Sequence, residues 1–224
     1  MQTLTAPSAT MVEPDATSTT GRVDVLVVVE GVNDVEFLRR ISRIVHAGDP
    51  CLPDLSEMEA EGRLIFLPVG GSDLAVWSQR LAPLDVPEFH LADRDVSPLT
   101  EEHQAAVEAV NRRPNCIAAL TGKRHTENYV HPDAIFTARR LRVAYGPDDD
   151  LPELVAKQTY ELLDGRHRWR DIPSRKRRQM KHRAKRWLNT EAVDAMTADL
   201  LAQQDPDGDV RSWLEAIAWL AQQH

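Results

Sequence analysis

Short apolar runs, each followed by polar residues, recur through the first half of the 224-residue chain. Residues 23–29 read VDVLVVV, a β-branched run without polar alternation, which predicts a strand buried on both faces. Shorter runs at 64–67, 88–92 and 116–120 predict three more strands. Because helical stretches separate these runs, the pattern predicts an α/β fold with a mainly parallel four-stranded sheet.

The remaining periodic segments are expected to be helices. Residues 33–46 carry apolar side chains at helical spacing, and Asn33 with Glu36 forms the expected capping box. Residues 47–62 are interpreted as a loop, and Ser72 or Asp73 as the cap of the next helix. Further helices are expected at residues 74–81, 101–112, 133–145, 151–163, 175–187 and 190–203, and at the C-terminus after a turn at 205–208.

These elements suggest three parts of the chain. Residues 1–21 are rich in Thr, Ser, Ala and Pro and are expected to be a disordered leader. Residues 22–130 would form the α/β domain, and residues 131–224 a helical C-terminal extension. The leader lacks a basic start followed by an apolar block, and no apolar run is long enough for a membrane span. A cytoplasmic protein without membrane contact is therefore expected, with Cys51 and Cys116 reduced.

Charge is distributed unevenly along the chain. The formal net charge is -8, which argues against a protein that simply coats nucleic acid. Residues 166–186 nevertheless contain eleven Lys and Arg against one Asp, so this basic segment alone has a net charge of +10. It is the natural contact for phosphates, with Trp169 and Trp187 as stacking platforms. A solvated helix face or a protein-docking arm is the alternative interpretation.

Acidic residues gather at the predicted strand ends. Glu30 follows the first strand with Asp34 four residues later, Asp93 and Asp95 follow the third strand, and Glu127 follows the fourth. Ligands of open α/β sheets bind outside the carboxyl ends of the strands, and carboxylates are preferred ligands of Mg²⁺. A shared metal pocket is therefore possible. Each acid alone also fits an ordinary role as a strand-end charge, a first-turn helix acid or a turn former.

The order of these motifs resembles the TOPRIM domain, which topoisomerases, bacterial primases, recombination mediators and several nucleases share. The resemblance covers about residues 22–125, and it implies a Rossmann-like TOPRIM fold whose carboxylates hold catalytic magnesium. The residues that carry it are the strand 25–29 with Glu30 and Gly31, then Asp34, then the Gly70-Gly71 pair after the second strand, and finally Leu91-Ala92-Asp93-Arg94-Asp95.

A further segment resembles the TOPRIM domain of overcoming-lysogenization-defect (OLD) family nucleases. It reads KRHTENYV at residues 123–130, and Ser97 completes an Asp-x-Asp-x-Ser pattern. The resemblance implies two Mg²⁺ or Mn²⁺ ions held by Glu30, Asp34, Asp93, Asp95, Ser97 and Glu127. The Glu-Asn-Tyr triplet could instead be a loop with a partly buried tyrosine.

The same resemblance implies a lysine beyond the Glu-Asn-Tyr motif that assists at the scissile phosphate. Lys176, Lys181 and Lys185 are candidates, and Lys181 is assigned to catalysis together with Glu30, Asp93 and Asp95. Nucleic-acid contacts are expected from Lys123, Arg124, Arg175, Lys176, Arg177, Arg178, Lys181 and Lys185.

The functional expectation is a metal-dependent endonuclease that hydrolyses phosphodiester bonds of DNA or RNA in phage defence or repair. No GxxxxGK[ST] motif occurs, so ATP hydrolysis would come from a separate ATPase partner. The alternative is a catalytically weak nucleic-acid-binding or regulatory module of a larger complex. A phosphoryl-transfer enzyme that acts on a small molecule is a third possibility.

Overall fold

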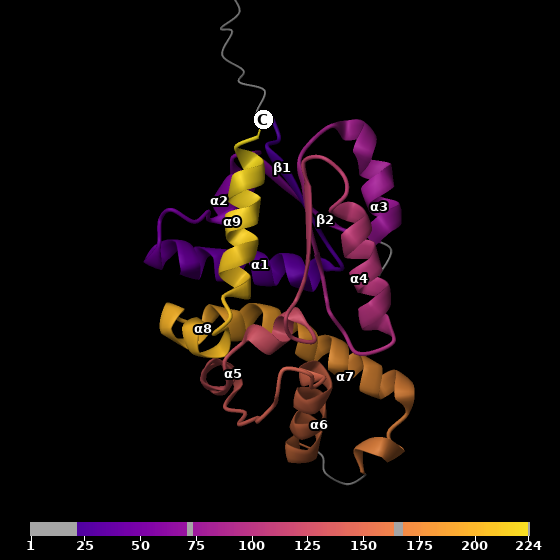
Figure 1. Cartoon of the computed structure of the whole chain (residues 1–224). Helices are drawn as coiled ribbons and strands as arrows, with labels where there is room; N and C mark the ends of the chain where they lie inside the picture. The colour runs from indigo at the N-terminus through magenta and orange to yellow at the C-terminus, as the bar shows by residue number, and fades with distance from the viewer. Residues whose placement is uncertain (1–21, 71–73, 164–167, 224) are drawn as a thin grey trace, which may run out of the picture.

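A four-stranded parallel sheet forms the centre of the protein, with the strand order β2-β1-β3-β4. The computed structural model describes residues 22–70, 74–163 and 168–223 (Figure 1). The predicted α/β class with a parallel sheet is therefore confirmed. The strands are β1 (Val25–Val29), β2 (Leu64–Pro68), β3 (Glu88–Ala92) and β4 (Cys116–Leu120).

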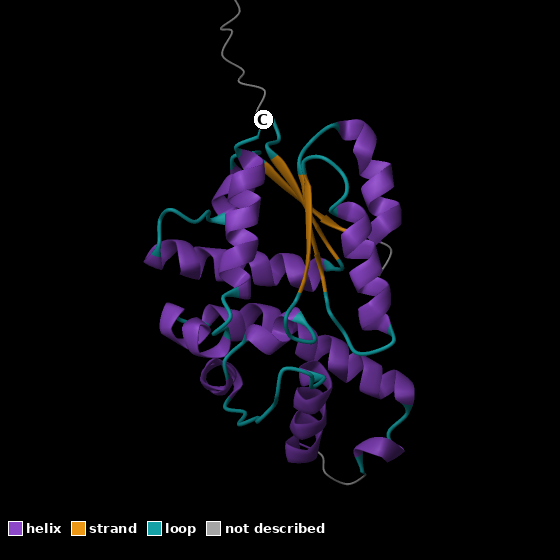
Figure 2. Ribbon diagram, in the orientation of Figure 1, coloured by secondary structure: helices purple, strands orange, loops and turns teal. Residues whose placement is uncertain are grey.

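Helices cover both faces of the sheet (Figure 2). On one side lie α1 (Val32–Gly48), α2 (Leu55–Ala60) and α9 (Asp209–Ala221), and on the other α3 (Leu74–Leu81) and α4 (Leu99–Val110). The alternation of side chains along β1 explains this arrangement. Val25, Val27 and Val29 enter the main core, whereas Leu26 and Val28 pack with Leu81 on the opposite face.

The other C-terminal helices lie beyond the carboxyl ends of the strands (Figure 1). They are α5 (Pro132–Arg139), α6 (Leu151–Leu163), α7 (Ser174–Trp187) and α8 (Ala198–Gln204). Helix α9 returns to the sheet and contacts β1, β3 and β4, with Trp213, Ile217 and Leu220 buried. One hydrophobic core therefore joins the sheet to the C-terminal helices. Four shorter turns are η1 (Ala82–Leu84), η2 (Thr126–Tyr129), η3 (Trp169–Asp171) and the π-helical η4 (Leu188–Ala192).

Two predictions near the N-terminus were wrong. Helix α1 begins at Val32 rather than after a capping box of Asn33 and Glu36, because the Asp34 carboxylate accepts the Gly31 N–H at 2.9 Å. The expected loop at 47–62 contains helix α2, whose first turn is capped by the Asp54 carboxylate.

Two C-terminal helices are shorter than predicted. Helix α5 ends at Arg139 because Arg140 adopts a left-handed conformation with φ 56°. The helix expected at 190–203 is divided, since η4 ends at Ala192 and Thr197 caps a new helix at Leu200 N.

Some predictions concern residues outside the described ranges. These are the leader at 1–21, Gly71, the caps Ser72 and Asp73, and residues 166 and 167 of the basic segment. Within the described ranges, no helix has the length and apolar character needed to cross a membrane.

Candidate active site

Four acidic side chains meet beyond the carboxyl ends of the strands, and we call them the carboxylate cluster: Glu30, Asp34, Asp93 and Glu127. Glu30 follows β1, Asp34 lies in the first turn of α1, Asp93 follows β3 and Glu127 lies in η2 after β4. Three of them are buried, and Glu30 is partly exposed. Buried carboxylates cost free energy unless they are paired, so their partners decide what the cluster can do.

Thr126 joins two members of the cluster. Its backbone N–H donates to Asp93 Oδ1 at 3.1 Å, and its hydroxyl donates to Asp34 Oδ1 at 2.9 Å. The Asp93 N–H in turn donates to Glu30 Oε1 at 3.2 Å. Three segments far apart in the sequence are thus held together by hydrogen bonds to carboxylate oxygens.

Lys185 of α7 provides the cluster with a positive charge. Its Nζ lies 3.5 Å from Glu127 Oε1 and 3.8 Å from Asp93 Oδ2. Burial alone would lower the pKa of the Lys185 ammonium, but the surrounding carboxylates hold that pKa above its ordinary value. The lysine is therefore charged at neutral pH and neutralises part of the cluster.

One lysine does not neutralise four acids. Burial, followed by the charge of Asp34, raises the pKa of Asp93 well above its ordinary value. Burial and the same Asp34 charge also raise the pKa of Glu30. The cluster therefore holds more negative charge than its surroundings stabilise, which is the electrostatic condition that favours binding of a cation.

Glu127 is held from the C-terminal helices. Asn189 lies in the π-helical turn η4, and its Nδ2 donates to Glu127 Oε1 and to the Lys185 carbonyl at 3.0 Å. Single π-helical turns occur frequently at functional sites. The second oxygen of Glu127, Oε2, is buried without a hydrogen-bond partner. An unpaired buried carboxylate oxygen is a position where an additional cation would be stabilised.

The donor chemistry of the cluster fits Mg²⁺ or Mn²⁺, because all its acceptors are carboxylate oxygens and one of them is unpaired. Their present spacing does not, since no group of three or more His, Cys, Asp or Glu side chains in the described ranges is arranged to hold a metal ion.

Asp95 and Ser97 lie outside the cluster. Asp95 Oδ1 is 3.0 Å from His125 Nε2 and 4.0 Å from Arg124 Nε, and the hydrogen bond with His125 lowers the pKa of this carboxyl. Asp95 has a left-handed backbone conformation, with φ 55°. Ser97 is exposed, and its hydroxyl donates to Glu101.

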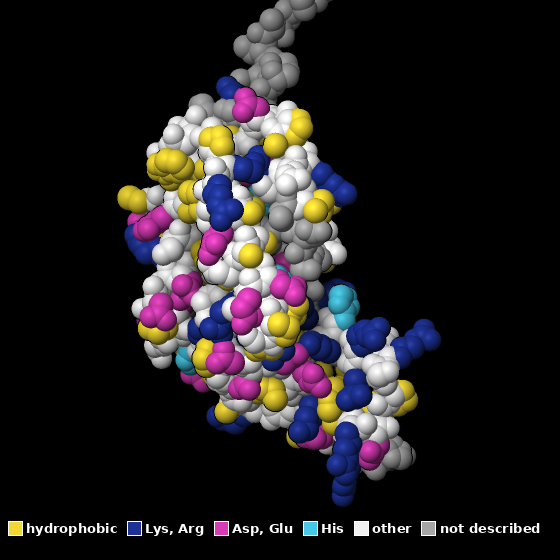
Figure 3. Space-filling view, turned by 45° about the vertical axis from the view of Figure 1, so that its right-hand side comes forward, with side chains coloured by type: hydrophobic (Ala, Val, Ile, Leu, Met, Phe, Trp, Pro, Cys, Tyr) yellow, Lys and Arg dark blue, Asp and Glu magenta, His cyan; other side chains and the backbone are white. Residues whose placement is uncertain are grey.

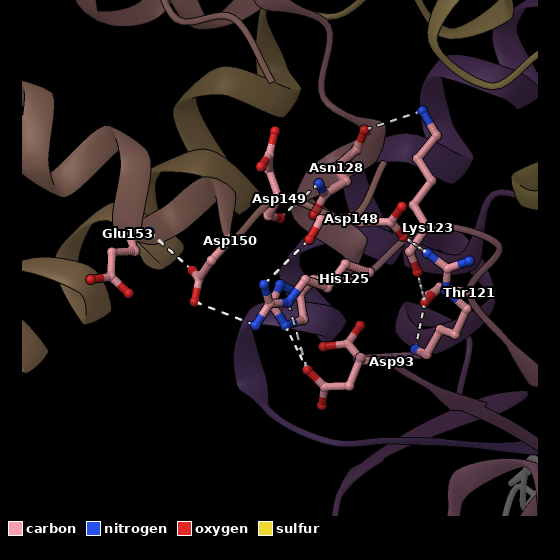
Figure 4. Close-up of polar contacts among 12 residues, drawn as sticks. Asp93, Thr121, Lys123, His125, Asn128, Asp148, Asp149, Asp150 and Glu153 are labelled. Atoms are coloured by element: carbon pink, nitrogen blue, oxygen red, sulfur yellow. Dashed lines mark hydrogen bonds and ion pairs between the residues drawn. The ribbon is translucent and has the colours of Figure 1, made fainter. Parts of the chain in front are cut away.

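Two basic residues that precede η2, Lys123 and Arg124, have partners within the protein, and Figure 4 shows those of Lys123 near Asn128. Lys123 Nζ donates to the carbonyls of Asn128, at 3.3 Å, and Gln204, and it lies 5.1 Å from the centre of the Tyr129 ring. Arg124 donates to the Asp148 carbonyl at 3.3 Å. Lys123 therefore connects the loop after β4 to helix α8.

The basic helix α7 presents its cations to different surroundings. Lys181 forms an ion pair with Asp150, whereas Lys185, one turn later, reaches the carboxylate cluster. Arg175 and Arg178 are exposed, and Lys176 Nζ lies 5.5 Å from the centre of the Tyr160 ring. In the view of Figure 3, Lys and Arg side chains gather over the lower lobe that contains α6 and α7.

Three polar residues at the site were not identified from the sequence: Thr126, His125 and Asn189. His125 and Thr126 directly precede Glu127, so their position in the sequence could have indicated that they belong to the same site. Asn189 follows Lys185 by four residues, a spacing that places two side chains on the same side of a helix. No short-range signal links it to Glu127, which is 62 residues away.

Comparison with known proteins identifies a similar fold. No protein-family model matches the chain, and no curated protein matches its sequence. Three solved structures of the C-terminal region of the Xanthomonas campestris pv. campestris OLD protein are similar to it. The mercury-phased structure has a TM-score of 0.50 and 14% identity over 90% of this chain and 98% of that chain. The iodine-phased structure has a TM-score of 0.49, and the platinum-phased structure 0.48, with the same identity. At 14% identity the similarity concerns the fold, an α/β arrangement with additional helices.

Proposed function

We propose that the protein is a metal-dependent nuclease of the TOPRIM type, related to OLD-family nucleases, that hydrolyses phosphodiester bonds of DNA or RNA. One observation carries the proposal: four carboxylates with excess negative charge meet a lysine from a strongly basic helix. Phosphodiester hydrolysis uses both features, since carboxylates hold divalent ions and a basic surface binds the polyanion. The similar fold of the OLD C-terminal region is consistent with this proposal.

The residues of the site have distinct roles in this proposal. The metal would be held by the carboxylate cluster, which consists of Glu30, Asp34, Asp93 and Glu127. Asp95 would lie beside the metal site, outside the cluster. When bound, the metal would activate a water and stabilise the leaving oxygen. Thr126 fixes the orientations of Asp34 and Asp93, as Asn189 does for Glu127. Lys185 would contact a non-bridging phosphate oxygen of the substrate.

A second function is favoured by a specific observation. The Lys185 ammonium lies within 4 Å of both Glu127 and Asp93, so the cluster already contains one internal counter-charge. If Lys185 stays in contact with Glu127 and Asp93 and no metal binds, the protein would bind nucleic acid through α7 without cutting it. It would serve a regulatory role, beside a separate ATPase.

Cleavage assays distinguish these two functions. Purified protein is incubated with plasmid, linear duplex, single-stranded DNA and transfer RNA in Mg²⁺, Mn²⁺ or EDTA. A nuclease cuts at least one substrate with either metal and none in EDTA, and Asp93→Asn abolishes cutting while the variant remains folded. Cutting that persists in Asp93→Asn would exclude the carboxylate cluster as the active site. Binding without cutting under every condition would favour the regulatory module.

A further inference from the structure

An arginine-lined groove lies beside the carboxylate cluster. Its volume is about 1070 Å³, and it is bounded by α1, α5, α6, α7 and η4. Its lining contains only two acidic residues, Glu36 and Glu191, so the groove has a net positive charge. The arginines are Arg40, Arg139, Arg140, Arg183 and Arg186.

The arginines differ in their partners. Arg40 pairs with Glu36 and, at 3.0 Å, with Asp194, and Arg139 pairs with Glu191. Arg140, Arg183 and Arg186 are exposed and form no ion pair with any residue in the described ranges. Three guanidinium groups are thus available to an anionic ligand, and their planar geometry matches phosphate oxygens.

Apolar side chains lie among these arginines. Val32, Leu162 and Leu163 line the groove and are 63%, 71% and 82% exposed. Trp187 also lines it, and Arg139 lies 5.7 Å from the centre of its ring. A duplex hides the faces of its bases by stacking, whereas an unpaired base can cover exposed apolar and aromatic surface.

The groove and the carboxylate cluster share helices α1 and α7. Asn33 and Arg186 line the groove, and their chain neighbours Asp34 and Lys185 belong to the cluster or contact it. A strand in the groove would therefore lie beside the first turn of α1 and the last turn of α7, and these two turns also carry Asp34 and Lys185.

We propose that this groove binds a single-stranded segment of nucleic acid. Its phosphates contact Arg140, Arg183 and Arg186, and its unpaired bases pack against Leu162 and Leu163. This proposal rests on the nuclease function above, because the strand continues into the same carboxylate cluster. An acidic peptide would also match the arginines, but only a polynucleotide accounts for both the groove and the phosphate-directed site next to it.

The test measures fluorescence anisotropy of labelled oligonucleotides in EDTA, with a single strand and a blunt duplex that contains the same sequence. Arg183→Glu/Arg186→Glu reverses two groove charges. Arg175→Glu/Arg178→Glu is the charge-matched control at the other end of α7. Leu163→Ser changes an exposed groove side chain, and circular dichroism confirms that each variant is folded.

The wild type should prefer the single strand by on the order of tenfold, as expected for a stacked base and a few phosphate contacts. The groove variant should lose this preference, and Leu163→Ser should weaken single-strand binding alone. The control should weaken both ligands equally. The proposal would be overturned if both double variants lost the same affinity for the single strand and for the duplex. It would also be overturned if the groove variant kept the wild-type preference for the single strand.

The nuclease function is tested separately from the groove. Because the binding assay contains no metal, its result does not depend on cleavage. Single-strand preference without any metal-dependent cutting would refute the nuclease function and retain the groove. If the protein cuts nucleic acid but the groove variant binds as the wild type does, single-strand binding in the groove is refuted and the nuclease function is retained.

Discussion

Replacement of Lys185 by methionine tests whether this lysine neutralises the carboxylate cluster. The change retains a long apolar side chain and removes the charge that lies 3.5 Å from Glu127 and 3.8 Å from Asp93. Breaking a buried ion pair costs about 3–5 kcal/mol. Because 26% of the Lys185 side chain is exposed, we expect the lower end, about 3 kcal/mol. For a chain of this size, this corresponds to a decrease in Tm of about 6–12 °C.

Lys181→Met is the matched control on the same helix. Its ion pair with Asp150 is more accessible, with 38% of the lysine side chain exposed, so its loss should cost about 0–1 kcal/mol. Thermal unfolding is measured for both variants in EDTA and in Mg²⁺. If the carboxylates bind metal, Mg²⁺ should restore most of the stability of Lys185→Met, because the ion replaces the missing charge. Equal losses in the two variants, or no stabilisation of Lys185→Met by Mg²⁺, would refute the reasoning.

Three further variants test the carboxylate cluster and the basic helix α7. Burial and the charge of Asp34 raise the folded-state pKa of Asp93 above its unfolded value. The stability that the protonated carboxyl contributes to the metal-free protein is therefore lost as the pH rises through the folded-state pKa, and the Tm of Asp93→Asn relative to the wild type in EDTA should increase as the pH rises above about pH 4. A constant or shrinking difference would contradict this. Glu127→Gln should lower turnover mainly at low Mg²⁺, with partial rescue by Mn²⁺, and an unchanged metal dependence of the cleavage rate would remove Glu127 from the site. Charge reversal at 175–178 should weaken binding to all sequences and flatten its salt dependence by roughly one unit for each phosphate that the variant no longer binds. Filter binding at several salt concentrations measures this, and an unchanged slope would indicate a docking surface.

The sheet could be predicted because its signals are local. The runs at 88–92 and 116–120 match β3 and β4, and the β-branched run before Glu30 contains β1. The break between η4 and α8 could not be predicted, since it depends on Thr197 as a cap and on packing against distant helices. Helix α2 was missed because six residues carry too little periodicity to distinguish them from a loop.

The site was predictable only in part for a similar reason. Strand ends bring Glu30 and Asp93 to one edge of a parallel sheet, so their proximity follows from topology. Because Lys181 and Lys185 lie on the same side of α7, the position of the helix along its axis decides which lysine reaches them. A four-residue spacing separates Lys181 from Lys185, and the sequence does not indicate which one faces Asp150 and which one faces Asp93.

Binding of Mn²⁺ to the purified protein measures directly whether the carboxylate cluster holds metal, because the ion is paramagnetic and its bound fraction is measurable by electron paramagnetic resonance without any substrate. If the carboxylate cluster is a metal centre, binding is saturable, Asp93→Asn abolishes it, Glu127→Gln weakens it, and the two bound ions show spin coupling. Lys181→Met should bind Mn²⁺ as the wild type does. If only free Mn²⁺ is detected at every concentration, or if Asp93→Asn binds Mn²⁺ as the wild type does, the carboxylate cluster is an internal ion-pair network and not a metal centre.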